Sequence, residues 1–186
     1  MKNFSLFQHA LKISETPGQD LGPISNLCRR DFDERESFVF KTQAPCLEYA
    51  CLMIENALLM RTKRSGRIYA GFEKLSLMQP VVERYLRIAD ISQTVYVFGE
   101  DDWQPPRHPN MRLIALSHDS SLAREWFLLA DCSIYQAALV ALDEDGFDNG
   151  KSADERNFTA FKSSNANVVS ELALAVEGMI DWAIAV

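Results

Sequence analysis

The feature that most constrains the fold is an alternation of short apolar runs and helical patterns over residues 37–98. Three runs rich in β-branched and aromatic residues predict strands: 37–42 (SFVFKT), 67–72 (RIYAGF) and 94–98 (TVYVF). The segments between them carry apolar residues at helical spacing: 46–60 and 75–91. We expect the second helix to start near Gln79, so that Pro80 falls in its first turn, where a missing N–H costs nothing. This order is typical of parallel βαβ units, with right-handed crossovers that lay the helices against the sheet.

The second half of the chain changes character. Four short strand-like runs follow with brief connections: 111–116, 125–131, 134–142 and 156–161. The second and third are close enough in sequence for only a tight turn, which predicts a hairpin. We therefore expect an α/β fold with a mixed sheet, in which parallel βαβ units are followed by an antiparallel meander, with flanking helices.

The 186 residues are the size of one globular domain, and we divide them into three segments. Residues 1–36 hold a short amphipathic helix at 5–13 and then an irregular arm that is rich in Gly, Pro and charges. Residues 37–163 form the α/β domain. Residues 164–186 predict an amphipathic helix, capped by Ser164 or Asn165, that packs on the domain or leads to an effector or a dimer partner.

Composition excludes several classes of protein. The net charge of −7 argues against binding to nucleic acid or anionic lipid, since both reward clusters of Lys and Arg. No apolar run approaches the roughly 20 residues that a membrane span needs. The N-terminal sequence lacks the features of a signal peptide, and we expect a soluble protein of the cytoplasm.

The four cysteines, Cys28, Cys46, Cys51 and Cys132, form no CxxC pair, so reduced thiols are the better interpretation. The four thiols leave open the covalent attachment of a chromophore such as a bilin. None of them has the electropositive surroundings of a reactive thiol, because the charges of Arg29 and Arg30 beside Cys28 are balanced by Asp31. We assign no cofactor and no metal. The chain also contains no phosphate-binding loop of the GxxxxGK[ST] or GxGxxG type and no GxSxG elbow.

Two places carry candidate binding chemistry. The run Gly99-Glu100-Asp101-Asp102-Trp103 follows the third strand, and ligands of open α/β sheets bind beyond the carboxyl ends of parallel strands. A solvated turn is the simpler interpretation of the same residues. Glu125 and Trp126 open a later strand, and Glu55 lies within an apolar helix, where an unpaired carboxylate would be costly. We select a provisional ligand-binding set: Glu55, Gly99, Glu100, Asp101, Trp103, Glu125 and Trp126.

Several short sequence segments occur in the same order as in a known family: Ile54-Glu55, Ile68-Tyr69-Ala70-Gly71-Phe72, Arg84-Tyr85-Leu86-Arg87-Ile88-Ala89, Val95-Tyr96-Val97-Phe98-Gly99-Glu100 and Arg124-Glu125-Trp126-Phe127-Leu128. Together they resemble the DICT sensory domain of diguanylate cyclases and two-component systems, over roughly Phe38 to Glu144. The resemblance implies a non-catalytic input domain of bacterial, cyanobacterial-type signalling, with roles in light responses and with a histidine kinase or a diguanylate cyclase as partner. It supplies no ligand and no catalytic residues to transfer.

Three functions remain open at this stage. A signalling input domain that binds a small molecule or protein and relays through its C-terminal helix predicts an apolar patch on that helix, exposed unless a partner or second subunit covers it. A ligand-free adaptor predicts an interaction surface alone. A small metal-dependent enzyme predicts that Glu100, Asp101 or Asp102 converges with His118 or Glu125 on one pocket.

Overall fold

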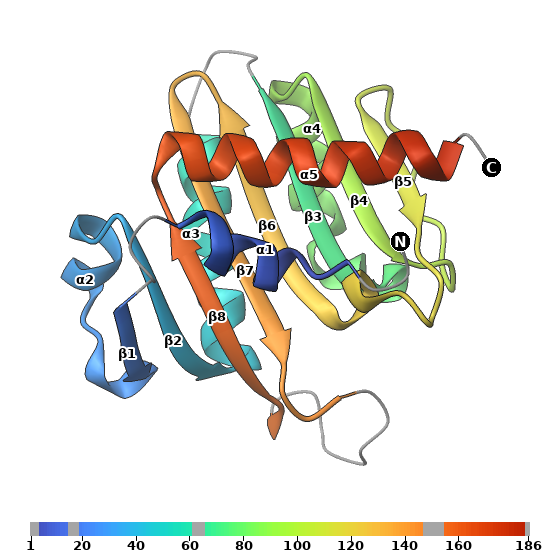
Figure 1. Cartoon of the computed structure of the whole chain (residues 1–186). Helices are drawn as coiled ribbons and strands as arrows, with labels where there is room; N and C mark the ends of the chain where they lie inside the picture. Colours follow the sequence, from blue (N-terminus) through green and yellow to red (C-terminus); the bar gives the residue numbers. More distant parts are fainter. Residues whose placement is uncertain (1–3, 15–18, 61–65, 147–154, 185–186) are drawn as a thin grey trace.

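The chain folds into one mixed β-sheet with helices on both faces (Figure 1). The computed structural model describes residues 4–14, 19–60, 66–146 and 155–184. The strands are β1 (Gln19–Pro23), β2 (Ser37–Gln43), β3 (Arg67–Lys74), β4 (Thr94–Glu100), β5 (Met111–Ala115), β6 (Glu125–Cys132), β7 (Tyr135–Asp143) and β8 (Asn157–Ser163). The helices are α1 (Leu6–Ile13), α2 (Arg29–Glu34), α3 (Ala44–Leu59), α4 (Val82–Ile91) and α5 (Ala166–Ile184), with short 3-10 segments η1 (Ile24–Asn26), η2 (Leu75–Val81) and η3 (Ser121–Arg124).

The sheet order is β1-β2-β8-β7-β6-β3-β4-β5. Strands β3, β4 and β5 are mutually parallel, and the ladder from β3 through β6, β7 and β8 to β2 is antiparallel. The mixed sheet expected from the sequence is confirmed, as is the hairpin, whose last pair is Cys132 with Tyr135. Its arrangement differs from a simple succession, however, because β6, β7 and β8 lie between β2 and β3.

The N-terminal arm is more regular than the sequence indicates. Gln19 and Asp20 of β1 pair in parallel with Phe38 and Val39, which makes β1 one edge of the sheet. The charged cluster that follows forms α2. The prediction of an irregular arm is therefore wrong for 19–23 and 29–34, because backbone pairing with β2 orders a segment whose Gly and Pro content suggests a loop.

The helix expected from Gln79 begins later. Pro80 lies inside the 3-10 segment η2, and α4 starts at Val82. Tighter 3-10 turns are common at helix starts, and here they occupy the stretch before Val82.

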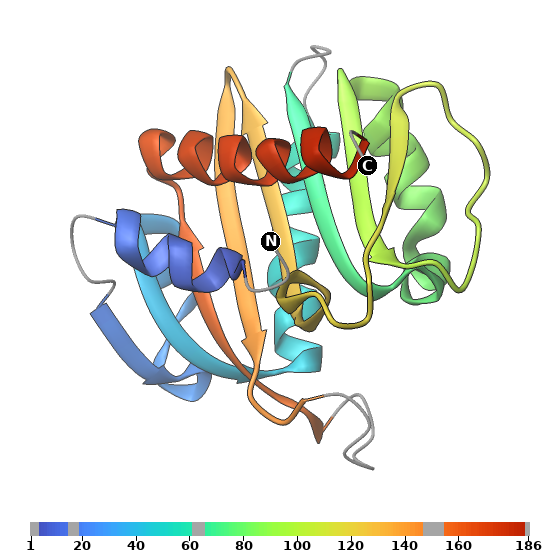
Figure 2. The same cartoon turned by 45° about the vertical axis from the view of Figure 1, so that its right-hand side comes forward.

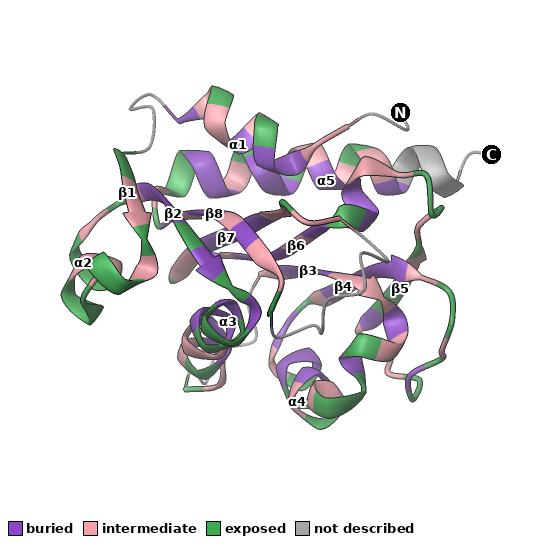
Figure 3. Cartoon of the chain, turned by 90° about the horizontal axis from the view of Figure 1, so that it is seen from below, coloured by how far each residue is buried: buried purple, intermediate pink, exposed green. Residues whose placement is uncertain are grey.

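Two apolar layers cover the two faces of the sheet (Figure 3). Helices α3 and α4 pack on one face, and α1 and α5 lie side by side on the other, as the turned view also shows (Figure 2). Gly71 permits one of the tightest contacts, because a Cβ there would lie 2.1 Å from the ring of Phe127, its partner on β6. A glycine inside a strand often marks such a close approach.

Helix α5 packs its apolar stripe inward. Val168, Val169, Leu172, Val176 and Ile180 are buried against the sheet and α1. The expectation of an exposed apolar patch on this helix is wrong for its described part, where the stripe belongs to the core of the same chain and Leu174 is an isolated exposed side chain. The cap is confirmed, since the side-chain oxygen of Asn165 accepts hydrogen bonds from the amides of Asn167 and Val168. The last two residues, on which the expected continuation of this helix depends, lie outside the described residues.

No helix in the described part of the chain has the length and apolar character to cross a membrane.

Candidate functional site

The carboxyl ends of β4 and β5 and the start of β6 lie together at one end of the strands. We call this end of the sheet the carboxyl edge. Gly99 near the end of β4 is required there, because a Cβ would lie 2.8 Å from the carbonyl oxygen of Phe72 and 3.0 Å from the amide nitrogen of Leu75. Its own carbonyl accepts from the amide of Leu116, which carries the chain past β5 towards η3. The structure therefore assigns Gly99 a packing role that brings β3, β4 and η2 together.

The acidic residues after β4 have separate partners. Glu100 Oε1 lies 2.6 Å from Nδ1 of His118. Asp102 accepts from both the amide and the hydroxyl of Ser76 at 2.9 and 2.6 Å, so it caps η2. Asp101 is exposed, and Trp103 packs against the core on the α3/α4 face. One pair expected by the enzyme hypothesis, Glu100 with His118, is thus present, while Asp102 is directed elsewhere.

Glu125 is the most constrained of the provisional ligand residues. It is 2% exposed, and its Oε2 accepts from the backbone amides of Leu6 and Phe7 at 2.9 and 3.1 Å. Its Oε1 accepts from the hydroxyl of Ser5, which in turn caps α1 by accepting from the amide of Gln8. Unsatisfied N–H groups and a partial positive charge at a helix start favour an anion, and Glu125 supplies one from within the chain.

Burial raises the pKa of Glu125, and the hydrogen bonds from Ser5, Phe7 and Leu6 offset this only in part. The carboxylate is therefore held by its donors in an environment that disfavours its charge. We call this contact between Glu125 and residues 5–7 the α1 latch.

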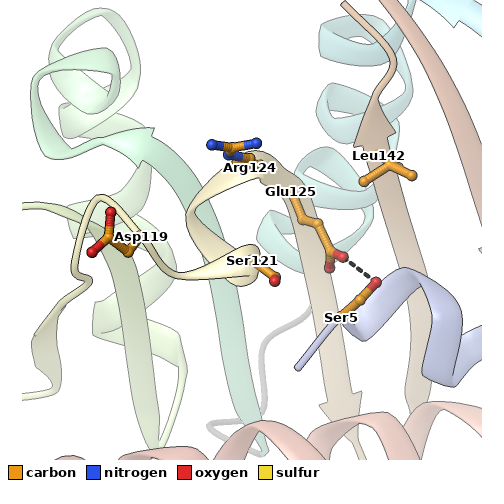
Figure 4. Close-up of a pocket in the computed structure, with 6 residues that line it drawn as sticks. All are labelled: Ser5, Asp119, Ser121, Arg124, Glu125 and Leu142. Atoms are coloured by element: carbon orange, nitrogen blue, oxygen red, sulfur yellow. Dashed lines mark hydrogen bonds between the residues drawn. The ribbon is translucent and has the colours of Figure 1, made fainter. Parts of the chain in front are cut away.

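A hollow of about 340 Å³ opens beside the α1 latch. It is lined by Ser5, Asp119, Ser121, Arg124, Glu125 and Leu142, from α1, the β5–η3 loop, η3, β6 and β7. Figure 4 shows the Glu125 carboxylate directed at the Ser5 hydroxyl at this place. Five of the six lining residues carry a hydroxyl, a carboxylate or a guanidinium, groups that can hydrogen-bond a small polar molecule.

Trp126, next to Glu125 in sequence, lies on the opposite face of the sheet. Its indole N–H hydrogen-bonds the buried Cys51, and its ring packs edge-on against Phe158 at 6.1 Å. Successive side chains of a strand point to opposite faces, so Glu125 and Trp126 cannot line the same pocket. Burial raises the pKa of the Cys51 thiol well above its usual value, which makes it an unreactive core residue.

Glu55 also belongs to the α3/α4 face. It is 5% exposed, lies 3.4 Å from Nε of Arg84 and accepts a hydrogen bond from the hydroxyl of Tyr85. Burial raises the pKa of Glu55, while Tyr85 and Arg84 act in the opposite direction. This network joins α3 to α4 in the interior and satisfies the carboxylate whose cost the sequence analysis noted.

The provisional ligand-binding set is thus divided. Glu125 lines the hollow, Glu100 lies at the carboxyl edge, and Glu55, Trp103 and Trp126 pack on the other face. Five residues of the lining were not selected from the sequence: Ser5, Asp119, Ser121, Arg124 and Leu142. The alternation of faces along β6 could have separated Glu125 from Trp126, whereas the approach of Ser5 to a residue 120 positions away has no local signal.

A second ion cluster closes the carboxyl edge of the sheet. Arg156, just before β8, lies 2.5 Å from Oε2 of Glu73 and also pairs with the buried carboxylate of Asp143. The guanidinium also stacks over the ring of Phe158 at 5.5 Å. These contacts attach β8 to the ends of β3 and β7.

A family model for the sensory domain in diguanylate cyclases and two-component systems, DICT, matches residues 36–144, more than half of the chain. The chain belongs to the DICT family. None of the curated proteins matches the chain in sequence. Among solved structures, the polyphosphate kinase of Porphyromonas gingivalis aligns over 81% of this chain with a TM-score of 0.54 and 9% identity. Because the alignment spans 28% of that enzyme's length at so low an identity, it shows a shared fold alone.

The DICT match ends before β8. Residues of the matched region nevertheless hold segments outside it, since Glu125 anchors α1, and Glu73 and Asp143 bind Arg156. The structural unit is therefore larger than the matched region.

Proposed function

We propose that this chain is a non-catalytic sensory input domain of bacterial signalling that binds a small polar molecule in the hollow beside the α1 latch. In this proposal the bound molecule acts on α1, and the change is relayed to a histidine kinase or a diguanylate cyclase in the cytoplasm. The family membership supports the sensory role. The lining of the hollow supports the class of ligand.

The observation that carries the proposal is the double engagement of Glu125. The same buried carboxylate lines the hollow and holds the first amides of α1. A ligand that donates a hydrogen bond to Glu125 therefore competes with, or reinforces, the α1 latch.

A path from α1 onwards is available through packing. α1 contacts α5 on the same face of the sheet. Glu177 of α5 is fixed to the sheet at 2.5 Å from Arg67 and accepts from the hydroxyl of Tyr69 at 2.6 Å. A displacement of α1 would therefore change the packing of α5, which Glu177 also ties to β3.

The metal-dependent enzyme is the weaker alternative. It requires an acid after β4 to meet His118 or Glu125 in one pocket. Glu100 does pair with His118, but neither lines the hollow, while Asp102 is engaged by Ser76 and Glu125 by α1. Within the described residues no group of three or more His, Cys, Asp or Glu side chains is placed to hold a metal ion.

The test is a thermal-shift screen of the full chain against amino acids, sugars, nucleotides and cyclic dinucleotides. We expect a hit to raise the melting temperature of the wild type and to lose that effect in Ser121→Val, which lines the hollow. Ser117→Ala changes an exposed serine of the β5–η3 loop that does not line the hollow; this control should respond as the wild type does.

Hydrogen exchange gives the second readout. A bound hit should change the exchange of the Leu6 and Phe7 amides, which donate to Glu125. A hit that binds Ser121→Val as well as it binds the wild type, or that leaves these amides unchanged, contradicts the proposed site and its relay. A chain that binds none of the probes and acts only on a protein would be the adaptor instead.

A further inference from the structure

Apart from Glu48, the exposed and half-buried positions of α3 are uncharged. Five residues share the outward face of α3 at helical spacing: Cys46, Tyr49, Met53, Asn56 and, at the C-cap, Met60. Tyr49 is 58% exposed and Met60 is 85% exposed, and the half-buried Leu52 and Leu59 flank them. We call these five residues the α3 stripe.

The inward face of α3 is apolar except for the buried Glu55. Leu47, Ala50, Cys51, Ile54 and Leu58 are buried in the core. A helix that is apolar on both faces is normally covered on both faces. The neighbouring helix α4 shows the ordinary pattern, because its exposed positions Glu83, Arg87 and Asp90 are charged.

We propose that the α3 stripe is the interface of a symmetric dimer, in which α3 of a second copy packs antiparallel to it around a two-fold axis at Met53. This inference does not depend on the ligand proposed above. It moves the dimer contact expected on the C-terminal helix to α3, because the stripe of α5 is buried within its own chain.

Polar complementarity favours a second copy as the occupant. In the antiparallel arrangement each Tyr49 lies beside Asn56 of the other copy. Arg84 already donates to Oδ1 of Asn56 at 3.0 Å, which leaves the amide hydrogens of that side chain to donate to the tyrosine hydroxyl. A polar pair within an apolar stripe fixes the register of two helices.

Charge complementarity acts in the same direction. Glu48 and Glu55 are the charged residues of α3, and Arg84 of α4 lies against Glu55. An antiparallel two-fold places the α4 helices on the same side of the pair, so Glu48 of each copy approaches Arg84 and Arg87 of the other. An isologous contact of this kind is closed after two copies.

The oligomeric state of the full chain tests the proposal by sedimentation equilibrium over a range of concentrations. We expect a dimer whose dissociation constant rises at least about tenfold in Met53→Arg, since two like charges then meet at the axis. Leu174→Arg, at a 62% exposed leucine of α5, is the matched control and should leave the dissociation constant unchanged. Met53 is half-buried on the outer surface, and an unchanged circular dichroism spectrum will show that the variant is folded.

Disulfide trapping tests the orientation in a Cys28→Ser background, which removes the other exposed thiol. Antiparallel packing places Cys46 beside position 60 of the other copy, so Met60→Cys should yield a covalent dimer on oxidation and Met60→Cys with Cys46→Ser should not. The two Cys46 residues themselves lie roughly 21 Å apart along the helix axis and should remain reduced without Met60→Cys. A monomer at all concentrations, a dimer lost in Leu174→Arg but kept in Met53→Arg, or a Cys46–Cys46 disulfide would each overturn the proposal.

Discussion

At the scale of single residues, the side chain with the greatest consequence is Glu125. It joins a segment at the start of the chain to the middle of the sheet through three donors: Ser5, Leu6 and Phe7. Two effects on Glu125 oppose each other: the start of α1 favours the charged form of the carboxyl group, and the apolar surroundings disfavour it. The balance raises the pKa of this carboxyl group above its ordinary value.

The raised pKa of Glu125 predicts how stability depends on pH. The folded protein binds this proton more tightly than the unfolded chain, so the wild type loses stability as the pH rises from about 4.5, the ordinary value, through the folded pKa. Glu125→Gln keeps a carbonyl acceptor for Leu6 and Phe7 and carries no charge. We expect the free energy of unfolding of the wild type, relative to Glu125→Gln, to fall as the pH rises through this window.

Urea unfolding of both proteins at a series of pH values measures this difference. Glu55 and Glu73, whose pKa values burial also raises, are present in both proteins and cancel. A difference that is constant with pH, or that grows as the pH rises, would show that the carboxylate is not destabilised in the folded state.

At the scale of elements, the segments that can be read from local sequence agree with the structure. Strands β2, β3, β4, β6 and β7 and helix α3 lie close to their expected ranges, because β-branched and aromatic runs and helical periodicity are local signals. The short edge strand β1 is not recognisable in this way, since its pairing with β2 supplies its order. The insertion of β6, β7 and β8 between β2 and β3 is also invisible, because strand order depends on contacts between distant residues.

The residues of the candidate site also divide into those with a local sequence signal and those that depend on contacts between distant residues. The edge after β4 could be selected from chain order, as a place where a parallel strand ends, and Glu125 could be selected as a carboxylate that opens a strand. Ser5 and Leu142 could not, because they reach the hollow from α1 and β7, which are remote in sequence. Glu55, whose carboxylate the sequence marks as costly, is satisfied by Arg84 and Tyr85, and the buried Glu125 is satisfied by α1.

Helix α5 offers a prediction at this scale. The side chain of Asn165 accepts from the amides of Asn167 and Val168 at the start of the helix. Asn165→Ala removes this cap and should lower the free energy of unfolding by about 1 kcal/mol. Asn167→Ala, an exposed position two residues later that offers only its backbone amide, should change it by less than about 0.5 kcal/mol. Equal effects in the two variants, measured by urea unfolding, would mean that the cap does not stabilise α5.

At the scale of the whole molecule, the sheet order decides what can fold as a unit. Strand β8 pairs with β2 on one side and β7 on the other, so it joins the two halves of the sheet. The DICT match ends at residue 144, before β8 and α5. A fragment limited to 36–144 therefore leaves β2 without a neighbouring strand and uncovers the face that α1 and α5 bury.

The burial of α5 alone contributes a large share of the stabilising free energy. Five large apolar side chains of α5 are buried, Val168, Val169, Leu172, Val176 and Ile180, at roughly 1.5–3 kcal/mol each, which is on the order of 10 kcal/mol in total. That is comparable with the whole stability of a typical domain, about 5–15 kcal/mol. We expect the fragment 36–144 to show no cooperative thermal transition, and the fragment 1–144 to fail in the same way although it keeps β1 and α1. Co-expression of 1–144 with 145–186 should restore the transition, because Arg156 and β8 can then bind Glu73, Asp143, β2 and β7. A cooperative transition of 36–144 alone would mean that the matched region carries its own core, and that β8 and α5 are additions to it rather than parts of one folding unit.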